Sequence, residues 1–100
     1  MATRPHRTPE KVRALMNTLD RRGLLRPLYV LCKEYNVTLE AVLSGRRNPR
    51  VVQARDACIW KVLKVPMSSV EVGELFDMDH TSVIYARQRY QKRDMGRLLT

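Results

Sequence analysis

The stretch SVEVGELFDMDHTSVIYARQRYQKR, residues 69 to 93, decides the fold of this chain. A first helix is expected at its start, because Ser68 and Glu71 have the spacing of a capping box. Asp77 and Met78 then form a tight turn before a second helix begins. Helix, tight turn and helix is the layout of a helix-turn-helix, whose second helix enters the major groove of DNA.

The second helix of this unit opens with four polar residues, Asp79, His80, Thr81 and Ser82. An aspartate accepts a hydrogen bond from cytosine, a threonine meets the methyl group of thymine, and a serine bonds donors or acceptors. The alternative is that Asp79 only caps the helix and His80 is an exposed ring. Capping is compatible with base contact, so we predict that these four residues read base edges in the major groove.

The rest of the chain also predicts helices, and no segment alternates as a strand would. Thr8 and Thr38 are expected to cap the starts of helices, and Gly23, Asn36 and Gly45 are expected to end them. The fold class is therefore all-α, a small helical domain with a helix-turn-helix. The expected helices before the unit cover 9–22, about 26–35, 39–44 and 51–65, the last of them ending before Pro66 and being the central helix.

The segment RRNPR, residues 46–50, is an expected basic loop. It holds three arginines and no acid, and its Asn-Pro step disfavours a helix at Asn48. Arginine suits phosphate groups and the narrow minor groove of A·T-rich DNA. A solvated charge run is the alternative. The loop arginines, Arg46, Arg47 and Arg50, are our candidates for minor-groove contact.

The charge balance of the chain points to a polyanionic partner. Its 100 residues suit one domain, and 19 Lys and Arg against 10 Asp and Glu give a net charge of +9. Such an excess favours nucleic acid or an anionic membrane surface. No apolar run approaches the ~20 residues that cross a bilayer, and the N-terminus has no apolar signal segment. We therefore expect a cytoplasmic protein that binds nucleic acid and does not bind or cross a membrane.

Motifs for catalysis or metal binding are lacking in the sequence. Cys32 and Cys58 lie far apart in apolar stretches and are expected to be buried hydrophobic residues, and His6 and His80 do not complete a zinc spacing. The sequence holds no phosphate-binding loop and no nucleophile elbow, and His80 beside Asp79 implies no nucleophile. We predict a protein that is not an enzyme and uses no cofactor, metal or small-molecule substrate.

From about Leu28 to Tyr90 the sequence resembles the C-terminal DNA-binding domain of the bacterial replication initiator DnaA. The DHTSV of residues 79–83 is similar to the family's DHTTV. The basic loop followed by QAR at 53–55 and the EVG of 71–73 are further motifs in the family's order. The resemblance implies a DnaA domain IV fold, which is Trp-repressor-like, and binding to double-stranded DNA.

The resemblance also implies how each element contacts DNA. The helix opened by Asp79 would read a DnaA box in the major groove while the basic loop enters the adjacent minor groove. Two-groove contact suits a monomer on a non-palindromic site. The resemblance implies phosphate contacts by Arg55, Lys64 and Ser69. Arg87 of the last helix is a further candidate for phosphate contact.

Two departures from the family change the expectation. The turn Asp77-Met78 is one residue shorter than the family's Gly-Gly-Arg turn and lacks its arginine, so we expect Asp77 to repel DNA and the preferred site to differ. The ATPase domain of DnaA is absent from these 100 residues. We therefore expect a free-standing DNA reader.

The expected organisation is a basic arm and first helix at 1–23, the DNA-binding domain at 24–93 and a short tail at 94–100. The function favoured is that of a transcription regulator or a phage-type accessory factor. A replication regulator that competes for DnaA boxes is the alternative within this class. A second alternative is an adaptor that docks a partner protein through the first helix, unless that helix only covers its own core. Single-strand RNA binding is disfavoured, because one Trp and one Phe offer few stacking faces.

Overall fold

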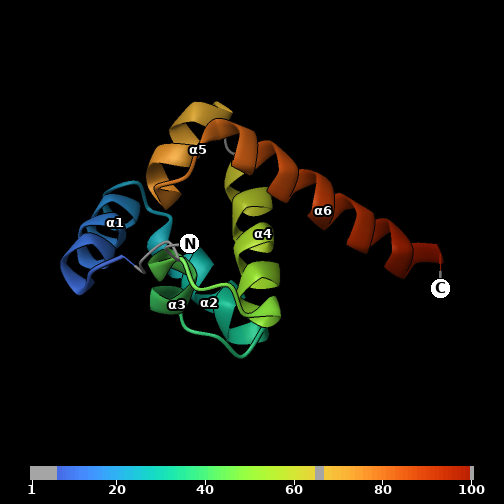
Figure 1. The fold of residues 1–100 in the computed structure, drawn as a ribbon, viewed down its shortest axis with the longest axis horizontal. Helices are drawn as coiled ribbons and strands as arrows, with labels where there is room; N and C mark the ends of the chain where they lie inside the picture. The colour runs from blue at the N-terminus through green and yellow to red at the C-terminus, as the bar shows by residue number, and fades with distance from the viewer. Residues whose placement is uncertain (1–6, 65–66, 100) are drawn as a thin grey trace, which may run out of the picture.

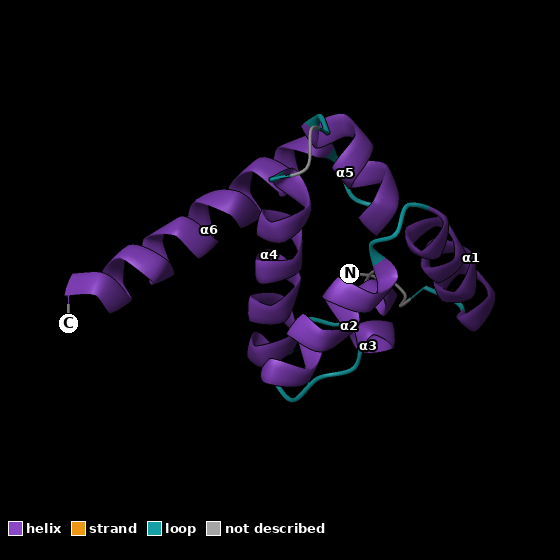
Figure 2. Ribbon diagram, turned by 180° about the vertical axis from the view of Figure 1, so that it is seen from behind, coloured by secondary structure: helices purple, strands orange, loops and turns teal. Residues whose placement is uncertain are grey.

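The computed structural model of the protein describes residues 7–64 and 67–99, with side chains up to Arg93. These residues form helices joined by short loops and no strand, so the all-α prediction is confirmed (Figure 2). The helices are α1 (Pro9–Arg21), α2 (Leu25–Glu34), α3 (Leu39–Ser44), α4 (Pro49–Leu63), α5 (Ser69–Phe76) and α6 (His80–Leu99).

The predicted boundary residues end and begin the early helices. The hydroxyl oxygens of Thr8 and Thr38 accept hydrogen bonds from the amides three residues later, at 3.2 and 3.1 Å. Gly23 and Gly45 follow α1 and α3 with left-handed φ values of 71° and 89°. Asn36, with φ of 58°, closes the turn after α2 in the same region. These caps confirm the local predictions.

The predicted bounds of α4 were wrong at both ends. The helix begins at Pro49, because Asn48 is extended with ψ of 140° and proline suits the first helical position. Arg50, predicted in the loop, therefore lies in the first helical turn. The helix ends at Leu63, and Pro66 lies outside the described residues.

The segment predicted as a C-terminal tail is helical as far as Leu99, because α6 continues through it. The last turns of α6 extend away from the other helices, as both views of the ribbon show (Figures 1 and 2). The beginning of α6 packs on α5, and its middle packs on α4.

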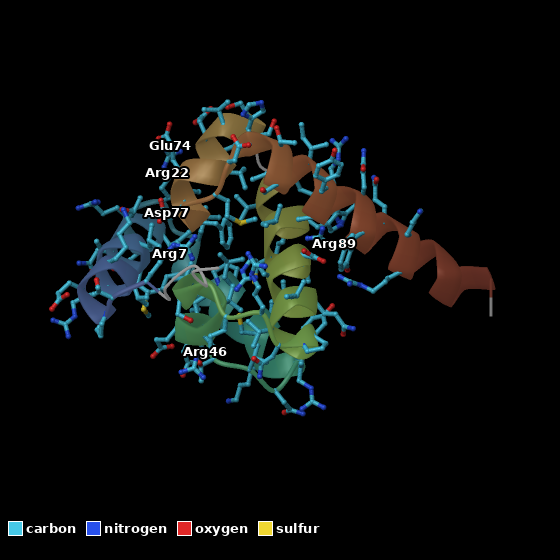
Figure 3. All side chains as sticks on the ribbon, in the orientation of Figure 1. Arg7, Arg22, Arg46, Glu74, Asp77 and Arg89 are labelled. Carbon is cyan, nitrogen blue, oxygen red and sulfur yellow. The ribbon has the colours of Figure 1, made fainter. Side chains whose placement is uncertain are left out.

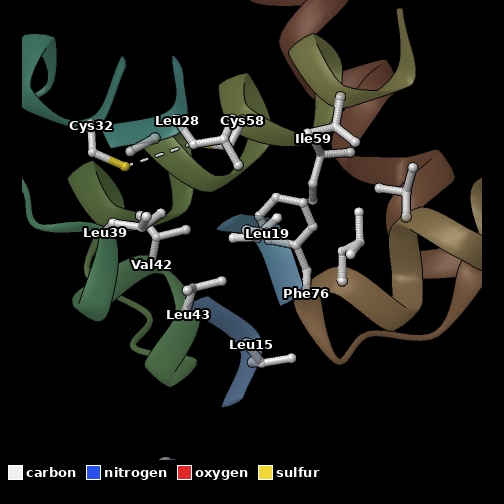
Figure 4. Close-up of a cluster of buried hydrophobic side chains, with 14 of the residues drawn as sticks. Leu15, Leu19, Leu28, Cys32, Leu39, Val42, Leu43, Cys58, Ile59 and Phe76 are labelled. Atoms are coloured by element: carbon white, nitrogen blue, oxygen red, sulfur yellow. Dashed lines mark hydrogen bonds between the residues drawn. The ribbon is translucent and has the colours of Figure 1, made fainter. Parts of the chain in front are cut away.

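Helix α4 is the central helix, as its apolar arc predicts. It packs against α2, α3, α5 and α6 and runs through the middle of the molecule (Figure 1). Phe76 of α5 lies in the core beside Leu19 of α1 and Ile59 of α4 (Figure 4). Cys32 and Cys58 are buried as predicted, with their Sγ atoms 3.7 Å apart. One apolar core therefore connects helices from both ends of the chain.

Helix α1 is part of this core. Its Val12, Leu15 and Leu19 are buried in the same cluster as residues of α4 and α5, and α1 packs on α2, α3 and α5. The sequence left two roles open for the apolar face of this helix, docking of a partner protein or covering of the domain's own core. The structure favours the second role.

Gly73 lets the turn of the helix-turn-helix pack directly on α5. The amide of Met78 donates to the carbonyl oxygen of Gly73 at 2.7 Å. A Cβ atom at position 73 would overlap the carbonyl oxygen of Met78, which belongs to the backbone and has no flexible end to move aside. Only glycine fits this position without a shift of the turn.

Gly73→Ala is expected to lower the free energy of unfolding by about 1–3 kcal/mol through this overlap. Helix propensity alone predicts the opposite sign, because alanine is favoured over glycine by about 1 kcal/mol inside a helix. Urea unfolding followed by circular dichroism measures the change. Ala14→Gly, at an exposed position of α1, gives the propensity effect alone. A Gly73→Ala variant as stable as the parent would contradict the close packing of the turn.

Candidate nucleic-acid interface

The start of α6 presents polar side chains to solvent. The carbonyl of Asp79 accepts the first hydrogen bond of the helix, from the amide of Val83 at 3.1 Å. Val83 is fully buried, and this fixes the rotation of the helix about its axis. Asp79, His80 and Thr81 are consequently exposed, and Ser82 is half-buried. The structure thus brings the predicted base-contacting residues together on one exposed turn.

The side chains of Asp79 and His80 also contact each other. Oδ1 of Asp79 lies 3.3 Å from Nδ1 of His80, and both side chains are more than half exposed. The contact places the imidazole ring beside the carboxylate. Such a pair offers an acceptor and a ring nitrogen at neighbouring positions, which suits the donor and acceptor pattern of base edges.

Arg55 of α4 holds the start of the basic loop between α3 and α4. The Arg55 guanidinium donates to the carbonyl of Val42 at 3.0 Å and to that of Arg46 at 2.8 Å. Burial lowers the pKa of Arg55 from its ordinary value, although arginine stays charged. Arg46 and Arg47 of the loop are exposed. The structure therefore shows Arg55 holding the loop, and its phosphate contact stays a prediction.

Arg7 ties the turn before α6 to the end of α3 (Figure 3). Its Nε donates to Oδ2 of Asp77 at 2.8 Å and its Nη2 to the carbonyl of Asp77 at 2.5 Å. Its Nη1 donates to the carbonyl of Leu43, and its amide to that of Ser44, both at 2.9 Å. Arg7 of the predicted basic arm is therefore held by the fold, and residues 1–6 lie outside the described residues. Arg7 also pairs with the charge of Asp77, and the expected repulsion of DNA by Asp77 stays a prediction.

A buried carboxylate holds the middle of α6 on α4. Asp56 is fully buried, and Arg89 donates to both of its oxygens, at 3.1 and 3.0 Å. Arg93 donates to the same carboxylate at 3.0 Å. The hydrogen bond to Asp56 raises the pKa of Arg89. Arg89 and Arg93 therefore fix the position of α6 on α4.

Lys64 lies away from the basic loop. It follows α4 at the end opposite Arg50, about 21 Å along the axis at 1.5 Å per residue. Its Nζ lies 5.4 Å from the ring centroid of Trp60, which stacks on Tyr90 of α6 at 5.6 Å. A phosphate bound by Lys64 would therefore lie beside α6 rather than beside the loop.

The two other predicted phosphate contacts lie on the helices of the helix-turn-helix. The predicted capping box is present: Ser68 accepts from the amide of Glu71 at 3.2 Å, and the Glu71 carboxylate accepts from the Ser68 amide at 3.3 Å. Ser69 is half-buried in the first turn of α5, and Arg87 is exposed on α6. Their contacts with phosphate stay predictions.

The described residues show neither a metal cluster nor a membrane span. No three His, Cys, Asp or Glu side chains among them gather as a metal site requires. Within the same residues, no helix is both long enough and apolar enough to cross a bilayer.

Comparison with known proteins identifies the family. The family model described as the bacterial DnaA protein helix-turn-helix matches residues 28–89, which is more than half of the chain. The chain belongs to the DnaA helix-turn-helix family. The match covers α4, α5 and the first half of α6, and therefore the basic loop and the recognition helix. The predicted resemblance is confirmed, and the chain is a DNA-binding domain of the DnaA type.

Two curated DnaA proteins match the same part of this domain. The chromosomal replication initiator protein DnaA of Mycoplasma genitalium is 33% identical over 63 residues. The protein of the same name from Mycoplasma pneumoniae is 32% identical over 63 residues. In each case the match covers 62% of the chain and 14% of the relative. No solved structure matches the chain.

Two positioning residues of this DnaA-like domain were missed in the sequence. Asp56 has a visible signal, because it is the one acid in α4 and is followed directly by the apolar run of residues 57–60. Arg7 has no local signal, because its partner Asp77 is 70 residues away. A buried or distant ion pair requires the three-dimensional fold before its partners can be named.

Arg89→Ala is expected to lower the free energy of unfolding by about 1–3 kcal/mol, because it leaves Asp56 buried with Arg93 as its remaining partner. Arg87→Ala on the exposed side of the same helix is the matched control and should change stability by less than about 0.5 kcal/mol. Thermal and urea unfolding measure both variants. Equal stability of the two would contradict the anchoring role of Asp56.

Proposed function

We propose that this DnaA-like domain binds double-stranded DNA at specific sites that resemble DnaA boxes. The recognition turn from Asp79 to Ser82 would read base edges in the major groove, and Arg46 and Arg47 would enter the adjacent minor groove. The observation that carries this proposal is the exposed polar turn at the start of a helix whose next side chain, Val83, is fully buried. A recognition helix uses its N-terminal residues in this way.

The charge of the chain supports the same function. A net charge of +9 favours approach to a polyanion, and the exposed arginines lie on a loop held by Arg55. Arg50 in the first turn of α4 would extend the basic surface towards the minor groove, and Arg87, Ser69 and Lys64 would contact phosphates. We propose that the protein acts in the cytoplasm, at the nucleoid, as a transcription regulator or a phage-type accessory factor.

A replication regulator that competes with an initiator for its boxes is the second candidate. The similarity of the DNA-binding segment to replication initiators supports it, because similar reading residues select similar sites. Footprinting at a replication origin in the presence of initiator separates the two. Displacement of the initiator supports competition, and protection confined to promoters supports transcription regulation.

His80→Ala and Thr81→Ala are expected to reduce the preference for the target site over a scrambled duplex, each by about tenfold, because a base contact contributes about 1–3 kcal/mol of discrimination. Fluorescence anisotropy with both duplexes measures the preference. Gln91→Ala, exposed further along the same helix, is the control that should keep it. Preference that survives both substitutions would exclude this turn as the reader.

Arg47→Ala is expected to weaken DNA binding and to reduce the slope of log affinity against log salt by about 1, because one cation near the phosphates is removed. Titrations at four salt concentrations give the slope. Arg13→Ala, which removes an exposed arginine from α1, should leave the slope unchanged. An unaltered slope for Arg47→Ala would place the loop away from DNA.

A further inference from the structure

Arg7 joins the two elements that the proposed function brings to DNA. Arg7 donates hydrogen bonds to the carbonyls of Leu43 and Ser44, and only Gly45 separates Ser44 from the basic loop. Asp77, which accepts two more, lies two residues before the recognition turn. In Figure 3, Arg7 is placed between Asp77 and Arg46. One guanidinium group therefore contacts the chain just before each of the two elements.

A second arginine holds the same end of the loop. Arg55 of α4 donates to the carbonyls of Val42 and Arg46, so the end of α3 and the first residue of the loop are both held on α4. Helix α4 also holds the middle of α6 through Asp56, and a direct connection between the start of the loop and the recognition turn requires a link from α3 to the turn before α6. Arg7 makes that link by hydrogen bonds to backbone and carboxylate.

We propose that Arg7 is a positioning residue that sets the spacing between the basic loop and the recognition helix, and so determines sequence preference. This inference rests on the proposed function, because the spacing matters only if both elements contact one DNA site. Binding in two adjacent grooves requires both elements at a fixed separation. A protein that holds them there before binding avoids the cost of ordering them on DNA.

The geometry distinguishes Arg7 from a direct DNA ligand. Its side chain is only 18% exposed, and all three guanidinium nitrogens donate to acceptors within the protein. Gly45 leaves room for it, because a Cβ atom there would lie 3.0 Å from Nη1 of Arg7. The planar fork of arginine reaches acceptors on both sides at once, which the single ammonium of lysine cannot do.

The variants for the test are Arg7→Lys and Asp77→Asn. The first keeps the charge and loses the two-sided fork. The second removes the ion pair and keeps a residue that tolerates the left-handed backbone at position 77. The control is Arg22→Ala, which removes another cation between α1 and the helix-turn-helix. Arg22 pairs with Glu71 at 3.7 Å, and both side chains are almost half exposed.

The probes are three duplexes. The first carries the preferred site, which is selected from a random library with the unsubstituted protein, and the second carries the same bases in scrambled order. The third carries the preferred site with diaminopurine in place of adenine at the positions where the basic loop would bind. Diaminopurine adds to the minor groove the amino group that guanine carries there and keeps adenine's major-groove pattern. Anisotropy at 25 °C gives the affinity for each duplex. Circular dichroism melts verify that every variant is folded at that temperature.

We expect the unsubstituted protein and Arg22→Ala to prefer the site and to lose affinity on the diaminopurine duplex. In Arg7→Lys and Asp77→Asn, the preference for the site over the scrambled duplex and the preference for the site over the diaminopurine duplex should both fall about tenfold, because the two contacts with DNA are coupled through their spacing. The dependence of affinity on salt should stay unchanged. If the ion pair only stabilises the fold, both variants will have a lower melting temperature and will keep both discriminations. That result would overturn the inference. An unsubstituted protein without preference for any selected site would overturn the proposed function instead, and the inference with it.

Discussion

The direct packing of the turn on Gly73 is the constraint on which the site depends. It fixes the angle at which α6 leaves α5, since no side chain separates the carbonyl of Met78 from the first helix. Val83 and Ala86 then set the rotation of α6 by their burial. The exposure of Asp79, His80 and Thr81 is a consequence of that angle and that rotation.

Ion pairs complete the positioning that the apolar core begins. Asp56 holds the middle of α6 on α4 through Arg89 and Arg93, and Arg7 holds the turn on the end of α3. An apolar core is non-directional, whereas hydrogen-bonded ion pairs fix orientation as well as distance. The proposed binding in two grooves needs both properties, because a small rotation of α6 would turn its exposed polar residues away from the base edges that they are proposed to contact.

Local signals in the sequence predicted most of the fold. Caps at Thr8, Thr38 and Ser68 and breakers at Gly23 and Gly45 depend on neighbours within four residues, and all of them are confirmed. The start of α4 was misplaced because Asn-Pro was taken as loop, although proline also suits a first helical turn. The part that could not be predicted was the set of long-range pairs, whose partners are far apart in the chain.

This domain is proposed to read DNA sequence in the DnaA manner. Fluorescence anisotropy of the unsubstituted protein, with a DnaA-box duplex and its scrambled form at two salt concentrations, tests it most directly. The account predicts a preference of about 10³ for a box-like site, with both affinities falling steeply as salt rises. Equal, salt-sensitive affinity for the two duplexes would contradict reading of DnaA boxes, and absence of binding to either would contradict a DNA-binding function altogether.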